Sequence, residues 1–278
     1  MRPCRSVLFL PASNARAIEK ARTLPVDVVI LDLEDAVGPD DKVEARDRAV
    51  EAVAGGGFGN HQVGVRINGL DTAWGAADLE SISAHAGLVL IPKAGAPEDI
   101  AAIARRAAPG TEIWAMIETP GAVVDLPSIA AAPGLTGLVL GANDLALGLR
   151  ARRVPGRAPL TYAMGAVVAA ARANGLAAID SVFNDLEDAQ GFAAECAQGR
   201  DFGFDGKSLI HPSQIDACNR AFSPSEAERA AAQAIVDAFA QPENAGRGAI
   251  RVNGGMAERL HLAQAVHLLS LPGATGHD

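Results

Sequence analysis

The sequence predicts an α/β protein that folds as a (β/α)8 TIM barrel with a C-terminal helix-hairpin-helix extension. Short runs of β-branched and aliphatic residues recur between longer alanine-rich stretches with helical spacing, which is the alternation of a parallel sheet covered by helices. Eight such runs are present, as many as a closed barrel requires. Only 4% of the 278 residues are aromatic while 49% are hydrophobic, so the core must be layered from small aliphatic side chains.

The predicted strands alternate with helices that end at recognisable stop signals. We expect helices at residues 14–23 before Pro25, at 97–108 before a Pro-Gly pair, and at 161–173 before an Asn-Gly pair. A doubly wound sheet is the alternative, but it needs fewer strands and a glycine-rich turn after the first one, where this chain reads PASN. The strands are expected at residues 7–10, 28–33, 63–67, 88–91, 112–117, 138–140, 177–180 and 204–207.

The rhythm of strand and helix changes after the eighth strand. A helix that ends near residue 239 is expected to begin here. Ser223 is its predicted N-cap, Pro224 its first helical position and Glu226 its capping-box residue. Beyond it we expect a polar linker, a hairpin with an Asn-Gly turn and a final helix, at residues 241–248, 250–254 and 258–269.

We therefore divide the chain into a TIM-barrel catalytic domain at residues 1–222 and a helical extension at residues 223–278. The final helix carries an apolar face that needs a partner surface, formed by Leu260, Ala263, Val266 and Leu269. We expect the extension to act as a lid that packs on a neighbouring subunit, and the protein to be a homo-oligomer.

Charge and composition exclude several classes of partner. The net charge of −9 repels a nucleic-acid backbone, so nucleic acid is not expected as a partner. No apolar run approaches the length of a membrane-spanning helix, and the first residues lead into a strand rather than a signal-peptide core. The three cysteines, Cys4, Cys196 and Cys218, lack metal-ligand spacing and indicate reduced thiols. These features predict a soluble cytoplasmic protein without a membrane partner.

Two carboxylates follow adjacent predicted strands. Glu118 comes after the fifth strand and Asp144 after the sixth, and the C-terminal ends of barrel strands meet at one mouth. Two such carboxylates, completed by water and a substrate oxygen, suit Mg²⁺. Glu34 and Asp35, after the second strand, are placed to hold the metal's water molecules. The alternative is that Glu118 and Asp144 cap the helices that begin beside them.

Two basic side chains also end predicted strands. Arg66 ends the third strand, so its guanidinium is expected in the mouth, where it suits a carboxylate or an enolate oxygen. An ion pair with Glu34 or Asp35 is its alternative role and is compatible with catalysis. We interpret Lys93, after the fourth strand, as a structural or supporting lysine, because no apolar pocket near it indicates a Schiff-base lysine.

A small basic patch of Arg5, Arg16 and Lys20 is expected around the first strand and its helix. Arg16 and Lys20 are four residues apart and share one helix face, so they suit the phosphates of a nucleotide-containing substrate. A solvated surface stripe is the alternative. The histidines lack metal-ligand spacing, and among them His211 is well placed, in the loop after the eighth strand.

Seven ordered motifs extend over nearly the whole chain. They are RSVLFLPASN, VVILDLEDAV with KVEAR, VGVRINGLDT, LVLIPKA, IWAMIETPGAV, GLVLGANDLALGL and GFDGKSLIHPSQI. Together they resemble the citrate lyase beta-subunit-like proteins, the CoA-ester lyases of the HpcH/HpaI aldolase family. The resemblance implies a Mg²⁺-dependent barrel, a homotrimer or hexamer, that cleaves or forms a carbon-carbon bond between a 2-oxo acid and an acyl-CoA. It implies a malyl-, citramalyl- or citryl-CoA-like ester as the corresponding substrate.

The resemblance also implies roles for individual residues. Glu118 and Asp144 become the metal ligands, Arg66 faces the substrate carbonyl or enolate, and Asp35 holds a metal-bound water. The implied CoA contacts are Phe9, Arg16, Lys20 and His211.

The chain departs from the family pattern at two positions. The family's tail carries G-x-M-[IV]-D, whose aspartate is the acid-base group supplied to a neighbouring subunit, and here Glu258 stands at that place. Its side chain is one methylene longer, which changes the reach of a proton-transferring group. Ala12 stands where the family has glycine, which constrains the backbone near CoA.

Two other functions remain open from the sequence. A CoA-independent class II aldolase acting on a hydroxy-oxo acid needs the same two carboxylates, although the basic patch argues against it. A non-catalytic subunit of a larger lyase complex fits the replacement of aspartate by Glu258.

Overall fold

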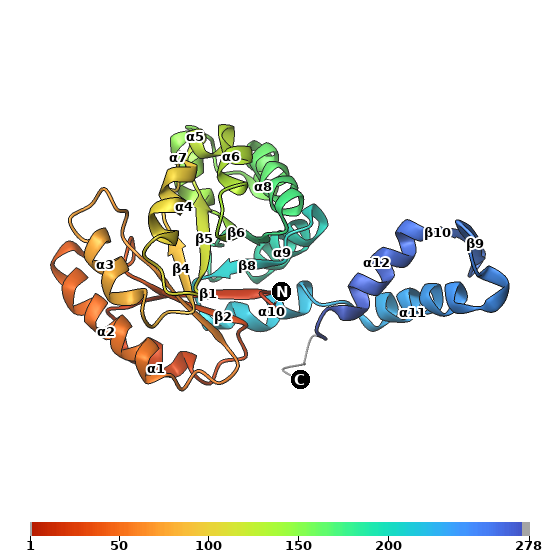
Figure 1. Ribbon diagram of the computed structural model, residues 1–278, viewed down its shortest axis with the longest axis horizontal. Helices are drawn as coiled ribbons and strands as arrows, with labels where there is room; N and C mark the ends of the chain where they lie inside the picture. Colours follow the sequence, from red (N-terminus) through yellow and green to blue (C-terminus); the bar gives the residue numbers. More distant parts are fainter. Residues whose placement is uncertain (1, 274–278) are drawn as a thin grey trace. The chain divides into compact units, whose positions relative to one another are not determined.

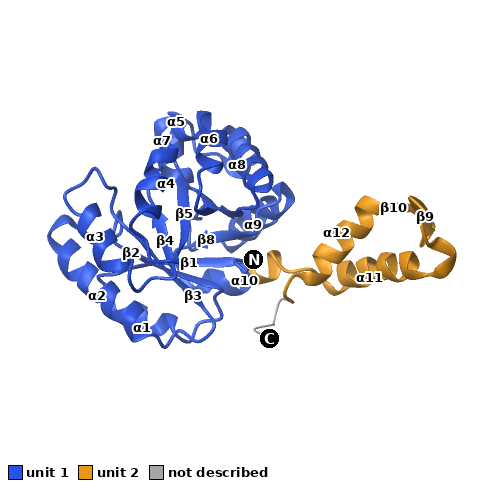
Figure 2. Ribbon diagram, viewed as in Figure 1, with its two compact units in different colours: residues 1–218 blue, residues 219–278 orange. Residues whose placement is uncertain are grey.

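The computed structural model describes residues 2–273. The chain consists of two compact units, residues 1–218 and 219–278 (Figure 2). The roles predicted for the two parts, a catalytic barrel and a lid on a neighbouring subunit, stay predictions. The last five residues of the expected extension, 274–278, lie outside the described part. Among the described helices, none has the length and apolar character that crossing a membrane requires.

The first unit is a closed barrel of eight parallel strands in chain order, which confirms the predicted fold (Figure 1). The sixth strand begins three residues earlier than expected, and the eighth lies two residues later. At the expected start the Asp205 carboxylate instead accepts the backbone N–H of Ala178 and pairs with Arg172, and pairing with the first strand begins at Lys207. The strands are β1 (Ser6–Pro11), β2 (Val28–Asp32), β3 (Gln62–Arg66), β4 (Leu88–Ile91), β5 (Glu112–Ile117), β6 (Leu135–Leu140), β7 (Ala177–Asp180) and β8 (Gly206–Leu209).

Helices surround the barrel and mostly end where the stop signals predicted. The α8 helix ends at Gly175, whose φ of 68° is the left-handed conformation that glycine adopts without strain. The helices of this unit are α1 (Ala15–Ala21), α2 (Lys42–Gly55), α3 (Gly75–Ile82), α4 (Pro97–Ala104), α5 (Pro120–Val124), α6 (Leu126–Ala130), α7 (Ala142–Gly148), α8 (Thr161–Asn174), α9 (Ala189–Phe202) and α10 (Ile215–Ala221). Three short 3-10 helices are η1 (Pro39–Asp41), η2 (Pro155–Leu160) and η3 (Pro212–Gln214).

The barrel interior is filled by alternate strand residues that form one buried cluster. Most are aliphatic side chains, as the composition predicts, and Trp114 on β5 is the largest member. Gly137 on β6 makes room for it, because a Cβ at that position would lie 2.7 Å from the indole ring. The indole of Trp114 therefore fills the space that a side chain at position 137 would otherwise occupy.

The second unit is built from α11 (Glu226–Ala240), η4 (Pro242–Asn244), a two-stranded hairpin of β9 (Ala249–Val252) and β10 (Gly255–Glu258), and α12 (Arg259–Ser270). The Asn253-Gly254 turn has φ of 50° and 84°, as the favoured two-residue hairpin requires. The predicted cap of α11 was wrong by two residues. Ser225, not Ser223, accepts the N–H of Glu228, whose carboxylate returns a hydrogen bond.

A buried charge cluster lies between the barrel wall and α9, and it includes Asp180 of β7 and Lys207 of β8, whose side chains point away from the barrel interior. The Lys207 ammonium, fully buried, donates to Asp180 at 3.0 Å and to Glu195 of α9 at 3.2 Å. Arg157 of η2 contacts the other Asp180 oxygen at 2.7 Å. Burial raises the pKa of Asp180, but Lys207 and Arg157 outweigh it and hold that pKa below its usual value.

We expect Asp180→Asn to lower the free energy of unfolding by about 3–5 kcal/mol, because it leaves two buried cations without their shared counter-charge. Urea unfolding measures this. The carboxylate's contribution is present above the unfolded pKa of Asp and is lost as the pH falls through the lower folded value, so wild type and variant converge in acid. As a control, Glu19→Gln removes an exposed partner of Arg22 and changes stability by less than about 1 kcal/mol.

We expect the protein to be an oligomer through its second unit, whose apolar face is exposed in the single chain. Met256 is 70% exposed, and Leu260 and Val266 are each 53% exposed. Val266→Asp places a charge on this face and is expected to shift the species seen by light scattering toward the mass of one chain. A wild-type protein that scatters as a single chain at micromolar concentration contradicts the prediction.

Candidate active site

A cavity of about 480 Å³ opens at the C-terminal ends of the barrel strands. Its lining includes four carboxylates and one guanidinium, so the charged residues leave a formal excess of three negative charges when all are ionised. An excess of this sign in a partly enclosed cavity favours a bound cation. The charged lining residues are Asp32, Asp35, Arg66, Glu118 and Asp144.

Arg66 is held in a fixed orientation at the wall of this cavity. Asp32 lies opposite it in the β2–β3 register and accepts from its Nε and Nη2 at 2.7 and 2.5 Å. Phe9 lies with its ring 5.6 Å from the guanidinium, and Glu34 pairs with Nη1 at 3.0 Å. Burial alone lowers the pKa of Arg66, but Asp32 and Glu34 raise it above its usual value, so the charge is permanent. The expected ion pair of Arg66 is therefore present, with Asp32 as an added and closer partner.

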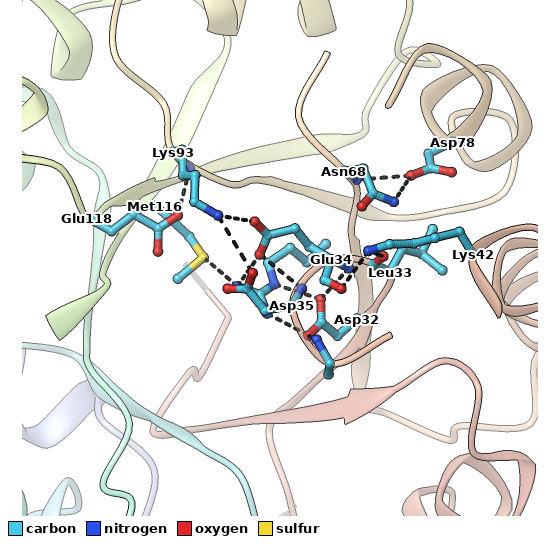
Figure 3. Close-up of polar contacts among 12 residues, drawn as sticks. Asp32, Leu33, Glu34, Asp35, Lys42, Asn68, Asp78, Lys93, Met116 and Glu118 are labelled. Carbon is cyan, nitrogen blue, oxygen red and sulfur yellow. Dashed lines mark hydrogen bonds and ion pairs between the residues drawn. The ribbon is translucent and has the colours of Figure 1, made fainter. Parts of the chain in front are cut away.

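Glu34 and Lys93 link β2 to β4 across the same mouth (Figure 3). The Lys93 ammonium donates to Glu34 and lies 3.7 Å from Asp35. The loop that carries both acids is fixed from below by Lys42, whose buried ammonium donates to the carbonyls of Leu33 and Glu34 at 2.7 Å each. Lys93 is thus a supporting residue, as the sequence indicated.

Glu118 is a buried carboxylate with few partners. The backbone N–H of Lys93, a residue with the unusual φ of 47°, donates to its Oε1 at 2.7 Å. Its Oε2 accepts no hydrogen bond from the described residues. Burial raises the pKa of Glu118 to about 7, with Glu34 and Asp144 adding to the rise. Gly141 makes the position possible, because a Cβ there would lie 2.4 Å from the Glu118 Cβ.

Asp144 lies in the first turn of α7 and has no ion pair or hydrogen bond within the described residues. Neither acid is a helix cap: Thr119 caps α5 and accepts from Ala122, and α7 begins after Gly141. The capping alternative is therefore excluded. Within residues 2–273 no three metal-binding side chains cluster. Glu118 and Asp144 line the same cavity, and a pair of carboxylates suits a cation that takes its other ligands from water and substrate, as Mg²⁺ does.

The other predicted contact residues lie in different places. Arg5 was wrongly expected in the basic patch, because it is buried and pairs with Asp27 at 2.8 Å. Phe9 lines the cavity beneath Arg66. Arg16 and Lys20 are exposed on α1, and His211 is exposed and caps η3 by accepting the N–H of Ser213; these three do not line the cavity. Glu258 is the N-cap residue of α12 in the second unit. The contacts predicted for these residues with CoA or substrate stay predictions.

Sequence reasoning assigned no role to Asp32 and overlooked Ser208. The pairing of strands places both, because Asp32 and Arg66 share a register position and Ser208 shares one with the interior residue Val7. The sequence carried no signal for either position, since register is set by the neighbouring strand. Asn184, in the loop after β7, donates a hydrogen bond to the Asn143 Oδ1 at 2.8 Å, and this contact depends on tertiary structure.

Comparison with known proteins gives consistent relatives. The family described as HpcH/HpaI aldolase/citrate lyase matches residues 5–212. A (3S)-malyl-CoA thioesterase of Cereibacter sphaeroides (strain KD131) is 45% identical, over 96% of this chain and 94% of its own. Citrate lyase subunit beta of Escherichia coli K12 is 34% identical, over 91% and 88%. A crystal structure of protein CitE from Mycobacterium tuberculosis with magnesium, acetoacetate and coenzyme A superposes with a TM-score of 0.81 at 32% identity, over 95% and 96%.

We predict that Glu118→Gln and Asp144→Asn each abolish Mg²⁺-dependent binding of a 2-oxo acid, measured by calorimetry, while the barrel stays folded. Gly141→Ala keeps both carboxylates but displaces Glu118, so it is expected to weaken Mg²⁺ binding as well. Glu80→Gln, on the exposed side of α3, is the matched control without effect. Unchanged titrations in both carboxylate variants contradict the metal assignment.

Proposed function

Because the chain belongs to the HpcH/HpaI aldolase/citrate lyase family, we propose that it is a Mg²⁺-dependent enzyme acting on a malyl-type 3-hydroxyacyl-CoA. The primary candidate reaction is the carbon-carbon lyase step, which yields a 2-oxo acid and an acyl-CoA. The observation that carries the proposal is a guanidinium fixed by Asp32 in the same cavity as Glu118 and Asp144, two carboxylates that lack a cationic side-chain partner in hydrogen-bond contact.

The chain's own residues supply binding and charge stabilisation. In the cleavage direction the 3-hydroxyl loses its proton, the adjacent carbon-carbon bond breaks, and its electron pair forms the enolate of the acyl-CoA. Arg66 is placed to stabilise that enolate oxygen, since Asp32 fixes its plane before substrate arrives. Glu118 and Asp144 would hold Mg²⁺, which when bound polarises the oxo-acid carbonyl. Glu34 and Asp35 are assigned to the metal's water molecules.

Hydrolysis of the thioester is the second candidate. It is favoured by the relative named (3S)-malyl-CoA thioesterase, which is 45% identical over nearly the whole chain. The same bound ester then loses its carbon-sulfur bond to water, giving a free acid and the CoA thiol. Phe9, Arg16, Lys20 and His211 are assigned to CoA in either reaction.

The products of malyl-CoA separate these reactions. With Mg²⁺ and purified protein, lyase activity releases glyoxylate, trapped as its phenylhydrazone, and leaves the thioester intact. Thioesterase activity releases thiol, detected with a disulfide reagent, and no glyoxylate. We expect glyoxylate to form and Arg66→Gln to slow its formation at least 100-fold, as losing a transition-state donor does. Activity on a hydroxy-oxo acid without CoA instead indicates the aldolase, and no turnover of malyl-, citramalyl- or citryl-CoA indicates a non-catalytic subunit.

Glu258 is proposed as the acid-base group that a neighbouring subunit receives in a trimer or hexamer. Glu258→Gln is then expected to remove turnover while leaving CoA-ester binding intact, a loss confined to the chemical step. Glu258→Asp is expected to retain or raise activity, because it restores the family's side chain. Glu258→Gln turnover equal to wild type contradicts this role.

A further inference from the structure

Ser208 lies in the wall of the candidate active site and faces the barrel interior. In the register of β8 with β1 it stands beside Val7, a member of the interior cluster. Its neighbour Lys207 faces the opposite way, toward Glu195 of α9, as the alternation of a strand requires. Ser208 also lines the cavity that holds Arg66 and Glu118.

The hydroxyl of Ser208 is buried without a partner. The residue is 2% exposed, and its Oγ makes no hydrogen bond with the described residues. Most buried hydroxyl groups are bonded, because leaving one unpaired costs stability. Ser6 on β1 shows the ordinary case of a bonded hydroxyl. It is also buried, and its Oγ accepts the backbone N–H of Asp27 at 3.2 Å.

The surroundings of Ser208 differ from the rest of the cavity. The charged residues come from β2 and β3 and from the segments that follow β5 and β6. The lining near β1, β7 and β8 is mostly apolar, with Leu10, Val182 and Ile210. A hydroxyl on this side gives a polar contact where the cavity otherwise offers few. The Ser208 hydroxyl therefore suits an uncharged oxygen of a ligand, such as a carbonyl oxygen, while the ligand's charged end lies at the side of the cavity that carries Glu118 and Asp144.

We propose that Ser208 is a substrate-contacting residue whose hydroxyl donates a hydrogen bond to an oxygen of the substrate's acyl part. This inference rests on the proposed function, since it takes the malyl-type CoA ester as the ligand of the cavity. The contact completes the hydrogen bonding of a side chain that the folded protein leaves unpaired. It also makes Ser208 a determinant of which acyl group is accepted, because a site built around a hydroxyl discriminates against ligands that lack the matching oxygen.

Ser208→Ala tests the inference, with Ser6→Ala as the matched control that removes a hydroxyl already bonded within the protein. For Ser208→Ala we expect the KM for malyl-CoA to rise about tenfold with a smaller change in kcat, the effect of one lost hydrogen bond. The melting temperature of the ligand-free protein is expected to stay the same or rise by about 2 °C, since no internal bond is lost. Ser6→Ala should show the reverse, a lower melting temperature and an unchanged KM.

Calorimetry with glyoxylate and Mg²⁺, compared with malyl-CoA, locates the oxygen. Weaker binding of both ligands to Ser208→Ala assigns the contact to the oxo-acid part, and weaker binding of malyl-CoA alone assigns it to the thioester carbonyl. Equal binding and turnover in wild type and Ser208→Ala overturn the inference while leaving the proposed function intact. A lower melting temperature of ligand-free Ser208→Ala also overturns it, because the hydroxyl then has a partner without substrate. Wild-type protein that binds neither ligand overturns the proposed function and the inference with it.

Discussion

The contact between Asp32 and Arg66 is the interaction on which the rest of the candidate site depends. The two residues end neighbouring strands at the same register position, so the closed sheet brings them together before any loop is considered. The Asp32 carboxylate also accepts backbone N–H groups of Glu34 and Ala36, which orients the acidic loop that follows. One ion pair thus sets both the plane of the guanidinium and the position of Glu34, and charge-assisted bonds of this geometry are stronger than neutral ones.

A second constraint is the surplus of negative charge that remains after these pairs are made. Glu34 is matched by Arg66 and Lys93. Among the described residues, Glu118 accepts one hydrogen bond, from a backbone N–H, and Asp144 has no ion pair. Burial therefore raises the pKa of Glu118 toward neutrality. A buried ionised carboxylate such as Glu118 costs the folded chain free energy when no positive charge lies beside it. A divalent cation would supply that positive charge in place of a proton, so Glu118 and Asp144 suit a metal ion.

The charges near β7 and β8 have a different purpose. Asp180 ends β7 as the site residues end or follow their strands, yet it faces α9 and forms a paired network with Lys207 of β8, Arg157 and Glu195. Because every member has a partner, this network holds a helix to the barrel wall rather than leaving a charge for a ligand. The structural cluster is therefore recognised by buried charges that are all paired, and the candidate active site by carboxylates that have no cationic side chain bonded to them among the described residues.

The sequence by itself determined the barrel, since eight aliphatic runs, their helix stops and the scarcity of aromatic residues are local signals that each strand-helix unit carries. It also placed Glu118, Asp144 and Arg66 at one mouth, because strand ends converge in any closed parallel barrel. Tertiary structure alone decided which face of a strand points inward. In β8, which lies two residues later than expected, the side chain of Lys207 points outward and that of Ser208 points inward. The reason is that pairing with the neighbouring strands sets the register, and the residues of the strand itself do not.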